Sequence, residues 1–351
     1  MNKYTEIAEQ LKREILAGKF EGDSRFPTGL QLAKRFGVSR PTINRVMYAL
    51  RQDGLVVTRA GASPRLTRFA EHATGTLGVI HPGCQYGDVL SEICESLVRQ
   101  GERFGWDIAL REMVETDPKR RLREFVDAIL NFSEERVAGL FLQPFACLGG
   151  VSSDQRRVED ELSRLGIPIV LLDYDPMRQD GRVVYDLVSM DNVAAGRTIG
   201  KCLLECGFRR LAFLRKAYFP PSSADRMLGV ASAVVDAGHS WSEHENVLDC
   251  EPECRKKVSR FLKTRHPDAI VCENDATAVQ LHMTLRALGV EGAVRLAGFD
   301  NQREARQLGI MSVAQPCEEI ASIAIQTLLM RMRNPSLPVF TALVHDCGVV
   351  R

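Results

Sequence analysis

Short apolar runs alternate with longer segments of helical periodicity over residues 76–351. Repeated βα units of this kind predict parallel sheets that are covered by helices on both faces. Because the span is large for one open sheet, we expect it to form two lobes. The predicted fold class is therefore α/β over most of the chain.

The order of these segments predicts which residues form each element. The expected strands are residues 77–80, 107–110, 139–142, 168–172, 210–214, 269–272, 294–299 and 311–314. The expected helices are residues 89–104, 119–132, 156–165, 194–206, 227–237, 255–264, 276–288 and 318–332. In open parallel sheets, ligands bind beyond the carboxyl ends of the strands, so the polar residues at those ends are the informative ones.

Polar side chains follow several of these strands or stand beside the start of the next helix. They are Gln143, Asp173, Asp191, Asn192, Arg226, Glu273, Asn274, Asp275, Asp300, Asn301 and Gln315. Asp191 taken alone is at least as well explained as a helix N-cap. Carboxylates, amides and an arginine recurring at so many strand ends nevertheless predict a cleft that can hydrogen-bond several hydroxyl groups.

The segment before this region has a different pattern, with two short blocks of apolar residues at helical spacing. The blocks comprise Leu30, Leu32, Ala33 and Phe36, followed by Ile43, Val46, Met47 and Leu50. Gly37 is suited to end the first helix and Ser39 to cap the second. Two short helices joined by a tight turn with glycine predict a helix-turn-helix, with residues 4–17 as a further amphipathic helix packed behind it.

A pair of short strands is expected after the second helix. Residues 55–59 are β-branched and strand-like, residues 60–64 have turn composition, and residues 65–69 suggest a second strand. Such a hairpin would form the wing of a winged helix-turn-helix. Apolar periodicity is then lost, so we place a linker at residues 69–75, between a DNA-binding domain at 1–68 and an effector-binding and dimerisation domain at 76–351.

Charge is distributed unevenly between these regions. Residues 25–68 contain nine Lys or Arg residues and a single acid, Asp53. Residues 1–72 hold 13 basic and 7 acidic side chains, whereas the remainder holds 33 and 38. Because dense basic patches attract the phosphate backbone, the head is predicted to bind double-stranded DNA while the body does not.

Several other classes of protein are disfavoured. No apolar stretch approaches the roughly 18 residues needed to span a membrane, and the charged start lacks a signal-peptide pattern, so we expect a cytoplasmic protein. The ten cysteines are scattered in mostly apolar contexts, as reduced thiols are, and we expect no metal and no cofactor. Neither a nucleophile elbow nor a P-loop occurs, so we expect no enzyme.

The head resembles the winged helix-turn-helix of the GntR family. The matching residues are Tyr4, Ile7, Ile15, Gly18, Pro27, Leu32, Ala33, the run from Phe36 to Arg40, Thr42, Leu50, Gly54, Leu55 and Gly61. The resemblance implies DNA contacts from Ser39, Arg40, Thr42, Asn44, Arg45, Arg59 and Gly61, with Gly61 near the minor groove. Arg40 is suited to read guanine edges, and Ser39 and Thr42 to bind phosphates.

The head also departs from the GntR pattern in two places. Gly29-Leu30 stand where the family has a Glu-Arg pair, so an expected arginine contact is absent. The wing carries Ser63 where a second glycine is common.

The body resembles the effector domain of LacI-family repressors, which is related to periplasmic sugar-binding proteins. The residues that carry this resemblance include Leu77 to Ile80, Gly139-Leu140, Gly166 to Pro168, Asp191, Gly207-Phe208, Arg226, Asn274-Asp275, Gly298 to Asp300 and Gln315-Pro316. It implies ligand contacts from Tyr86, Gln143, Asp173, Asp191, Arg226, Asn274, Asp275, Asp300 and Gln315. The closing Arg-x-Ser of that family is replaced by Gly348 to Arg351.

A GntR head on a LacI-type body resembles the chimeric repressors of arabinose metabolism. The resemblance implies a homodimeric repressor whose operator affinity is controlled by a small-molecule effector, a monosaccharide such as arabinose. Two alternatives remain open at this point. The body could serve only for dimerisation, or it could bind a ligand that is not a sugar, such as a nucleoside.

Overall fold

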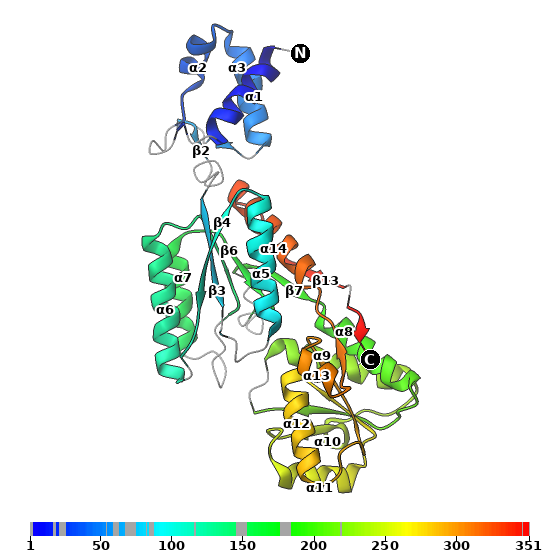
Figure 1. The fold of residues 1–351 in the computed structure, drawn as a ribbon. Coiled ribbons are helices and arrows are strands. Elements are labelled where there is room, and N and C mark those ends of the chain that lie inside the picture. The colour runs from blue at the N-terminus through cyan, green and yellow to red at the C-terminus, as the bar shows by residue number, and fades with distance from the viewer. Residues whose placement is uncertain are drawn as a thin grey trace.

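The computed structural model shows a small helical head followed by two α/β lobes (Figure 1). It describes residues 3–16, 19–20, 26–53, 55–58, 63–66, 75–81, 83, 88–115, 117–144, 153–175, 184–217, 220–345 and 347–350. The predicted contact residues Arg59, Gly61 and Tyr86 lie outside these ranges, as does all of the predicted linker except Gly75. The domain boundaries therefore stay a prediction.

The head is built from three helices and a two-stranded wing. Its elements are α1 (Lys3–Leu16), α2 (Gly29–Phe36), α3 (Arg40–Gln52), β1 (Val56–Val57) and β2 (Arg65–Leu66). Apolar side chains of the helices and of both strands form one core, which includes fully buried Leu11, Leu32, Val46 and Leu50. The predicted helix-turn-helix is confirmed, and the described part of the wing pairs antiparallel, with Val56 opposite Leu66.

The turn between α2 and α3 follows from local backbone chemistry. Gly37 takes a left-handed conformation with φ of 60°, which an L side chain would resist. Ser39 is the N-cap of α3, as predicted, although its hydroxyl lies 3.0 Å from that of Thr42 rather than on a backbone amide. Thr28 and Gln31 form a capping box at the start of α2 that the sequence analysis did not identify.

The first lobe contains a six-stranded parallel sheet. In spatial order its strands are β13 (Thr341–Val344), β7 (Asp186–Met190), β6 (Ile169–Leu172), β5 (Gly139–Leu142), β3 (Thr76–His81) and β4 (Asp107–Glu112). Helices α5 (Asp88–Arg103) and α14 (Cys317–Arg333) cover one face, and α6 (Pro118–Glu134) and α7 (Ser153–Leu165) cover the other. A buried bidentate ion pair between Arg331 and Asp186, at 2.8 Å for both bonds, fastens α14 to β7.

The second lobe repeats this design. Its strands in spatial order are β14 (Val349–Val350), β12 (Met311–Val313), β11 (Arg295–Phe299), β10 (Ala269–Cys272), β8 (Leu211–Arg215) and β9 (Val247–Asp249). All are parallel except β14, which pairs antiparallel with β12. The surrounding helices are α8 (Asn192–Glu205), α9 (Pro221–Asp236), α10 (Glu243–Asn246), α11 (Arg255–Arg265), α12 (Asp275–Ala287) and α13 (Arg303–Gln307). The predicted α/β class with two lobes is confirmed.

The chain passes between the lobes three times, at residues 190–192, 313–317 and 344–349. These segments are hydrogen-bonded to one another. The amide of Asp191 donates to the carbonyl of Val344 at 2.9 Å, and the amide of Ala314 donates to the carbonyl of Gly348 at 2.9 Å. These three crossings, which we call the hinge, are the connections of the chain between the two lobes.

Four strands and two short helices, α10 and α13, were not predicted, and one helix begins earlier than expected. The missed strands are β7, β9, β13 and β14. Of these, β9 and β14 are only three and two residues long, β13 lies largely exposed at a sheet edge, and the apolar run of β7 is interrupted by Asp186 and Ser189. Helix α9 begins at Pro221, not at Met227, because a proline at the first helical position needs no amide partner. Arg226 therefore lies within α9 instead of preceding it. Among the described helices, none is long and apolar enough to cross a membrane.

Candidate functional site

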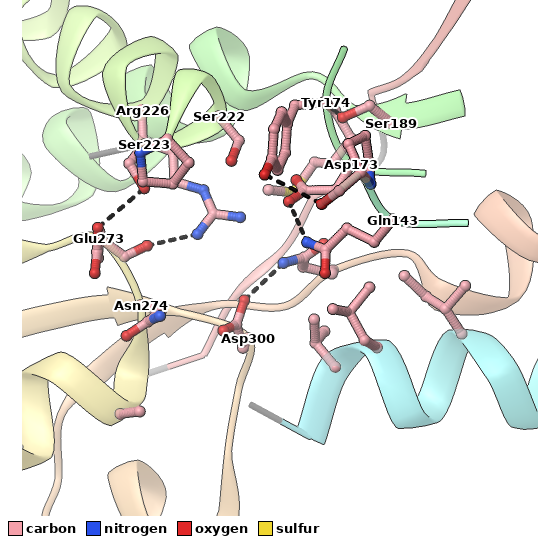
Figure 2. A pocket seen from close by; sticks show the side chains of 18 of the residues that line it. Gln143, Asp173, Tyr174, Ser189, Ser222, Ser223, Arg226, Glu273, Asn274 and Asp300 are labelled. Carbon is pink, nitrogen blue, oxygen red and sulfur yellow. Dashed lines mark hydrogen bonds between the residues drawn. The ribbon is translucent and has the colours of Figure 1, made fainter. Parts of the chain in front are cut away.

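A cavity of about 260 Å³ lies between the two lobes, at the carboxyl ends of their strands (Figure 2). The first lobe contributes Val89, Leu90, Ile93, Arg121, Phe125, Gln143, Pro144, Asp173, Tyr174, Ser189 and Met190, with Ile320 of α14. The second lobe contributes Lys216, Pro220, Ser222, Ser223, Arg226, Glu273, Asn274, Ala276, Thr277, Gln280, Asp300 and Gln315. The wall is therefore apolar along α5 and mixed elsewhere, with charged and amide side chains among apolar residues such as Phe125 and Met190.

Six of the nine predicted ligand contacts are brought together around this cavity. They are Gln143, Asp173, Arg226, Asn274, Asp300 and Gln315. Asp191 and Asp275 do not line it, and Tyr86 lies outside the described residues. The reasoning from strand ends therefore located the cavity, and ligand contact by these six residues stays a prediction.

Arg226 projects from α9 toward the middle of the cavity (Figure 2). Its Nε donates to Oδ1 of Asn192 at 2.8 Å, and its Nη1 donates to the carbonyl oxygen of Glu273 at 2.5 Å. The guanidinium also lies over the ring of Phe299, 4.6 Å from the centroid. These contacts hold a buried cation in one orientation, so it is preorganised to donate to a ligand oxygen. Phe299 is itself fully buried beneath Arg226, and it is not among the residues that line the cavity.

Asp173 and Asp300 occupy equivalent positions in the two lobes. Each directly follows a strand, and each has a positive φ, 76° and 103°, which is uncommon for a residue other than glycine. Strained backbone of this kind is concentrated at functional sites. The carboxylate of Asp173 accepts from Nε2 of Gln143 at 2.9 Å, and that of Asp300 accepts from Nε2 of Gln315 at 2.6 Å.

Burial raises the pKa of both carboxyl groups above the ordinary range, and the positive charge of Arg226 partly opposes that rise. The negative charges of Asp173 and Glu273 raise the pKa of Asp300 further. Each carboxylate accepts from a glutamine amide, and that of Asp173 also accepts from the hydroxyl of Ser222. Because a carboxylate has about four acceptor positions, both groups can still accept a hydrogen bond from a ligand hydroxyl.

Helices α8 and α9 touch at two glycines, and this contact fixes where Arg226 stands. A Cβ atom at Gly196 would lie 2.0 Å from the carbonyl oxygen of Arg226, and one at Gly229 would lie 2.1 Å from that of Val193. Only glycine permits such a close approach of two helix backbones. The position of Arg226 on α9 therefore depends on Gly196 of the neighbouring helix α8.

The sequence analysis missed several polar residues of the cavity. They are Tyr174, Ser189, Lys216, Ser222, Ser223, Thr277 and Gln280. Lys216 follows a predicted strand and could have been found by the rule that found Glu273 and Asp300. Ser222 and Ser223 could not, because the start of α9 was placed after them.

Asp191 has the structural role that was weighed against its predicted ligand contact. It is the N-cap of α8, where its Oδ1 accepts from the amide of Ala194 at 2.8 Å. Its Oδ2 lies 2.9 Å from Nδ1 of His345, on another of the segments that cross between the lobes. The N-cap interpretation is therefore confirmed, ligand contact by Asp191 stays a prediction, and the residue belongs to the hinge.

Asp275 lies behind the cavity wall and does not face the cavity. Its side chain is fully buried and accepts from the amide of Gln302 at 2.8 Å and from the hydroxyl of Ser312 at 2.8 Å. These bonds join α12 to the ends of β11 and β12, next to Asp300. Asp275 therefore supports the wall, and burial raises its pKa to about 7.

We predict that the pH dependence of stability distinguishes the protein from an Asp275→Asn variant. The unfolded carboxyl has a pKa of about 3.9, so between pH 4 and 7 the folded state holds a proton that the unfolded state has lost. The stabilisation from Asp275 is thus present below pH 4 and is lost as the pH rises through about 7. Urea denaturation of both proteins from pH 4 to 8 measures this difference. A gap in unfolding free energy that does not change with pH would contradict the assignment.

The exposed face of α3 carries the predicted DNA-reading residues of the head. Ser39, Arg40, Asn44 and Arg45 are exposed, and Thr42 is half-buried. The apolar face of the same helix packs into the core of the head through Ile43, Val46, Met47 and Leu50. The polar face is therefore free to enter a groove.

We predict that Arg40→Ala weakens binding to the preferred DNA sequence by about 1–3 kcal/mol, as loss of a bidentate guanine contact does. Affinity for random-sequence DNA should fall much less. Fluorescence anisotropy at fixed salt, with both DNA sequences, measures this. An equal loss on both would show that Arg40 contacts phosphate only.

The comparisons with known proteins agree with this architecture. Residues 3–65 match the profile of bacterial regulatory proteins of the gntR family, and residues 201–351 match that of the periplasmic binding protein-like domain. The arabinose metabolism transcriptional repressor of Geobacillus stearothermophilus is 22% identical, over 95% of this chain and 92% of its own length. The ribose operon repressor of Haemophilus influenzae is 22% identical, over 66% and 68%. A LacI family transcriptional regulator from Enterococcus faecium, solved with bound ribose, has a TM-score of 0.60 at 17% identity, over 79% and 97%.

The fold and these matches define a class of protein, in which a GntR-type DNA-binding head is joined to a periplasmic binding protein-like body. The predicted combination is therefore confirmed. Relatives that align over 95% and 93% of this chain are named arabinose metabolism transcriptional repressors, and others are named ribose operon repressors.

Proposed function

We propose that this protein is a transcriptional repressor whose affinity for operator DNA is controlled by a monosaccharide, such as arabinose, bound between the lobes. The proposal rests on the chemical groups that line the cavity between the lobes. Both lobes supply carboxylate, amide and hydroxyl groups to it, with one oriented arginine at its centre. Such a set can satisfy the closely spaced hydroxyls and ring oxygen of a sugar.

The size of the cavity supports a single sugar ring. A volume of about 260 Å³ lies near the lower end of the roughly 300–1,000 Å³ that is typical of small-molecule sites. A five- or six-carbon sugar fits this space. The apolar residues of α5 supply a surface for the C–H face of a ring, and the polar groups surround the remainder.

The proposed mechanism couples this cavity to the head. Each half of the ligand contacts one lobe, so its binding favours one hinge angle over others. In a homodimer, a change in hinge angle alters the spacing of the two heads, which we propose bind half-sites about one helical turn apart. Ligand binding then lowers operator affinity, and the protein needs no catalytic activity for this role.

A thermal-shift screen tests the proposed ligand class. The purified protein is heated in the presence of pentoses, hexoses, their acids, polyols and nucleosides. A ligand at 100 times its Kd stabilises the native state by about 2.7 kcal/mol, which gives a clear shift. We expect a monosaccharide to stabilise the protein. Stabilisation by nucleosides alone, or by no member of the panel, would contradict the proposal.

A further inference from the structure

An ion pair lies in the wall of the cavity, between Lys216 and Glu273. Lys216 follows β8 and Glu273 follows β10, which are neighbouring strands of the second lobe. Lys216 Nζ lies 2.6 Å from Oε1 of Glu273, and both residues line the cavity. The side chain of Glu273 is only 5% exposed, whereas that of Lys216 is 25% exposed. The ammonium group is thus the more accessible member of the pair.

Glu273 is fixed by contacts from other elements. Ser223 of α9 donates its hydroxyl to Oε2 at 3.2 Å, as Figure 2 shows, and Thr277 of α12 donates to Oε1 at 3.3 Å. Both carboxylate oxygens are therefore engaged by protein groups. The effect of Glu273 on a bound ligand then comes mainly from its negative charge, held in one place.

Two cations converge on residue 273. Lys216 contacts its carboxylate, and Arg226 donates to its carbonyl oxygen at 2.5 Å. Arg226 already faces the charges of Asp173 and Asp300. If Glu273 carried no charge, Lys216 would be a second cation at this end of the cavity without its ion-pair partner. An anionic ligand would then be attracted to Lys216 and Arg226 together.

We propose that Glu273 restricts the effector to neutral sugars by neutralising Lys216 and by placing a third carboxylate against any anionic ligand. This inference rests on the proposed function, since it names the subclass of sugar that the cavity accepts. The excluded ligands are aldonic and uronic acids, which share the hydroxyl pattern of a sugar but carry a carboxylate. Like charges brought together in a buried site oppose binding strongly, so one residue can set this preference.

Calorimetric titration of matched ligand pairs tests the inference. The pairs are arabinose with arabinonate, ribose with ribonate, and galactose with galacturonate. The wild-type protein should bind the neutral member of at least one pair and its acid at least tenfold more weakly. Glu273→Gln keeps an oxygen that can accept from Ser223 or Thr277 but removes the charge, so its affinity for the acid should rise at least tenfold. Adding Lys216→Met to the Glu273→Gln variant should abolish this gain in affinity for the acid.

The outcomes separate this inference from the proposed function. If the wild-type protein binds no member of any pair, the proposed function fails. If it binds a neutral sugar but Glu273→Gln leaves the preference unchanged, or if it prefers the acid from the start, the inference on Glu273 is wrong. Should Glu273→Gln fail to fold, Glu273→Ala removes the same charge and should show the same gain for the acid.

Discussion

Replacing Gly196 by alanine is expected to destabilise the second lobe by roughly 3 kcal/mol or more. The added Cβ would lie 2.0 Å from the carbonyl oxygen of Arg226, which belongs to the backbone of α9 and cannot rotate away. Helices α8 and α9 would have to separate, and the packing of Val230 and Ala233 of α9 in the common core would loosen. Chemical denaturation measures the loss of unfolding free energy.

Gly29→Ala provides the matched control for this substitution. Gly29 is also helical, but the nearest atom to an added Cβ is a methyl group of Ile43 at 3.6 Å, which is ordinary contact. Because alanine favours helix by about 0.5–1 kcal/mol over glycine, this variant should be as stable as the wild type or more stable. Equal effects of the two substitutions would show that the helices do not touch at Gly196.

Replacing Arg226 by methionine is expected to weaken effector binding about 100-fold or more. The change removes the central donor of the cavity and leaves Asn192 Oδ1 and the carbonyl of Glu273 without their partner. The loss of charged hydrogen bonds of this kind corresponds to about 1.5–3 kcal/mol each. Operator affinity without ligand should be retained, because Arg226 lies in the body and not in the head. Calorimetry and anisotropy measure the two quantities separately.

Arg197→Met is the control for the loss of an arginine from this helix pair. Arg197 lies on α8 and forms an exposed ion pair with Asp236 of α9. Exposed pairs contribute little, so effector affinity and stability should both stay close to the wild-type values. If Arg226→Met binds the effector as tightly as Arg197→Met does, the cavity is not the effector site.

Much of this fold could be predicted because its elements follow local rules. The turn at Gly37, the cap at Ser39 and the apolar blocks of the head need no knowledge of distant contacts. In the body, most parallel strands are buried on both faces and appear as continuous apolar runs, so eight strands were located from the sequence. Their carboxyl ends then led to Asp173, Asp300 and three other predicted ligand contacts of the cavity.

The remaining features depend on tertiary structure. Asp275 and Glu273 both follow β10 in the sequence. Because α12 packs against β11, Asp275 is turned away from the cavity, whereas Glu273 faces it. Asp191 could equally be a cap or a ligand contact from its sequence position alone. Edge strands such as β13 are partly exposed, so they lack the apolar pattern that marks a central strand.

The most direct test of the account is an anisotropy titration of the full-length protein with an operator fragment, with and without saturating sugar. The operator is the tightest sequence selected by the protein from a random DNA pool, and the sugar is the strongest hit of the thermal-shift screen. Salt is held constant, because affinity for DNA depends steeply on it. We predict that the sugar raises the Kd for the operator about 5- to 150-fold, the usual range of coupling between two sites, and that Arg226→Met shows no such change. An operator Kd that stays constant while the sugar is bound would contradict the account.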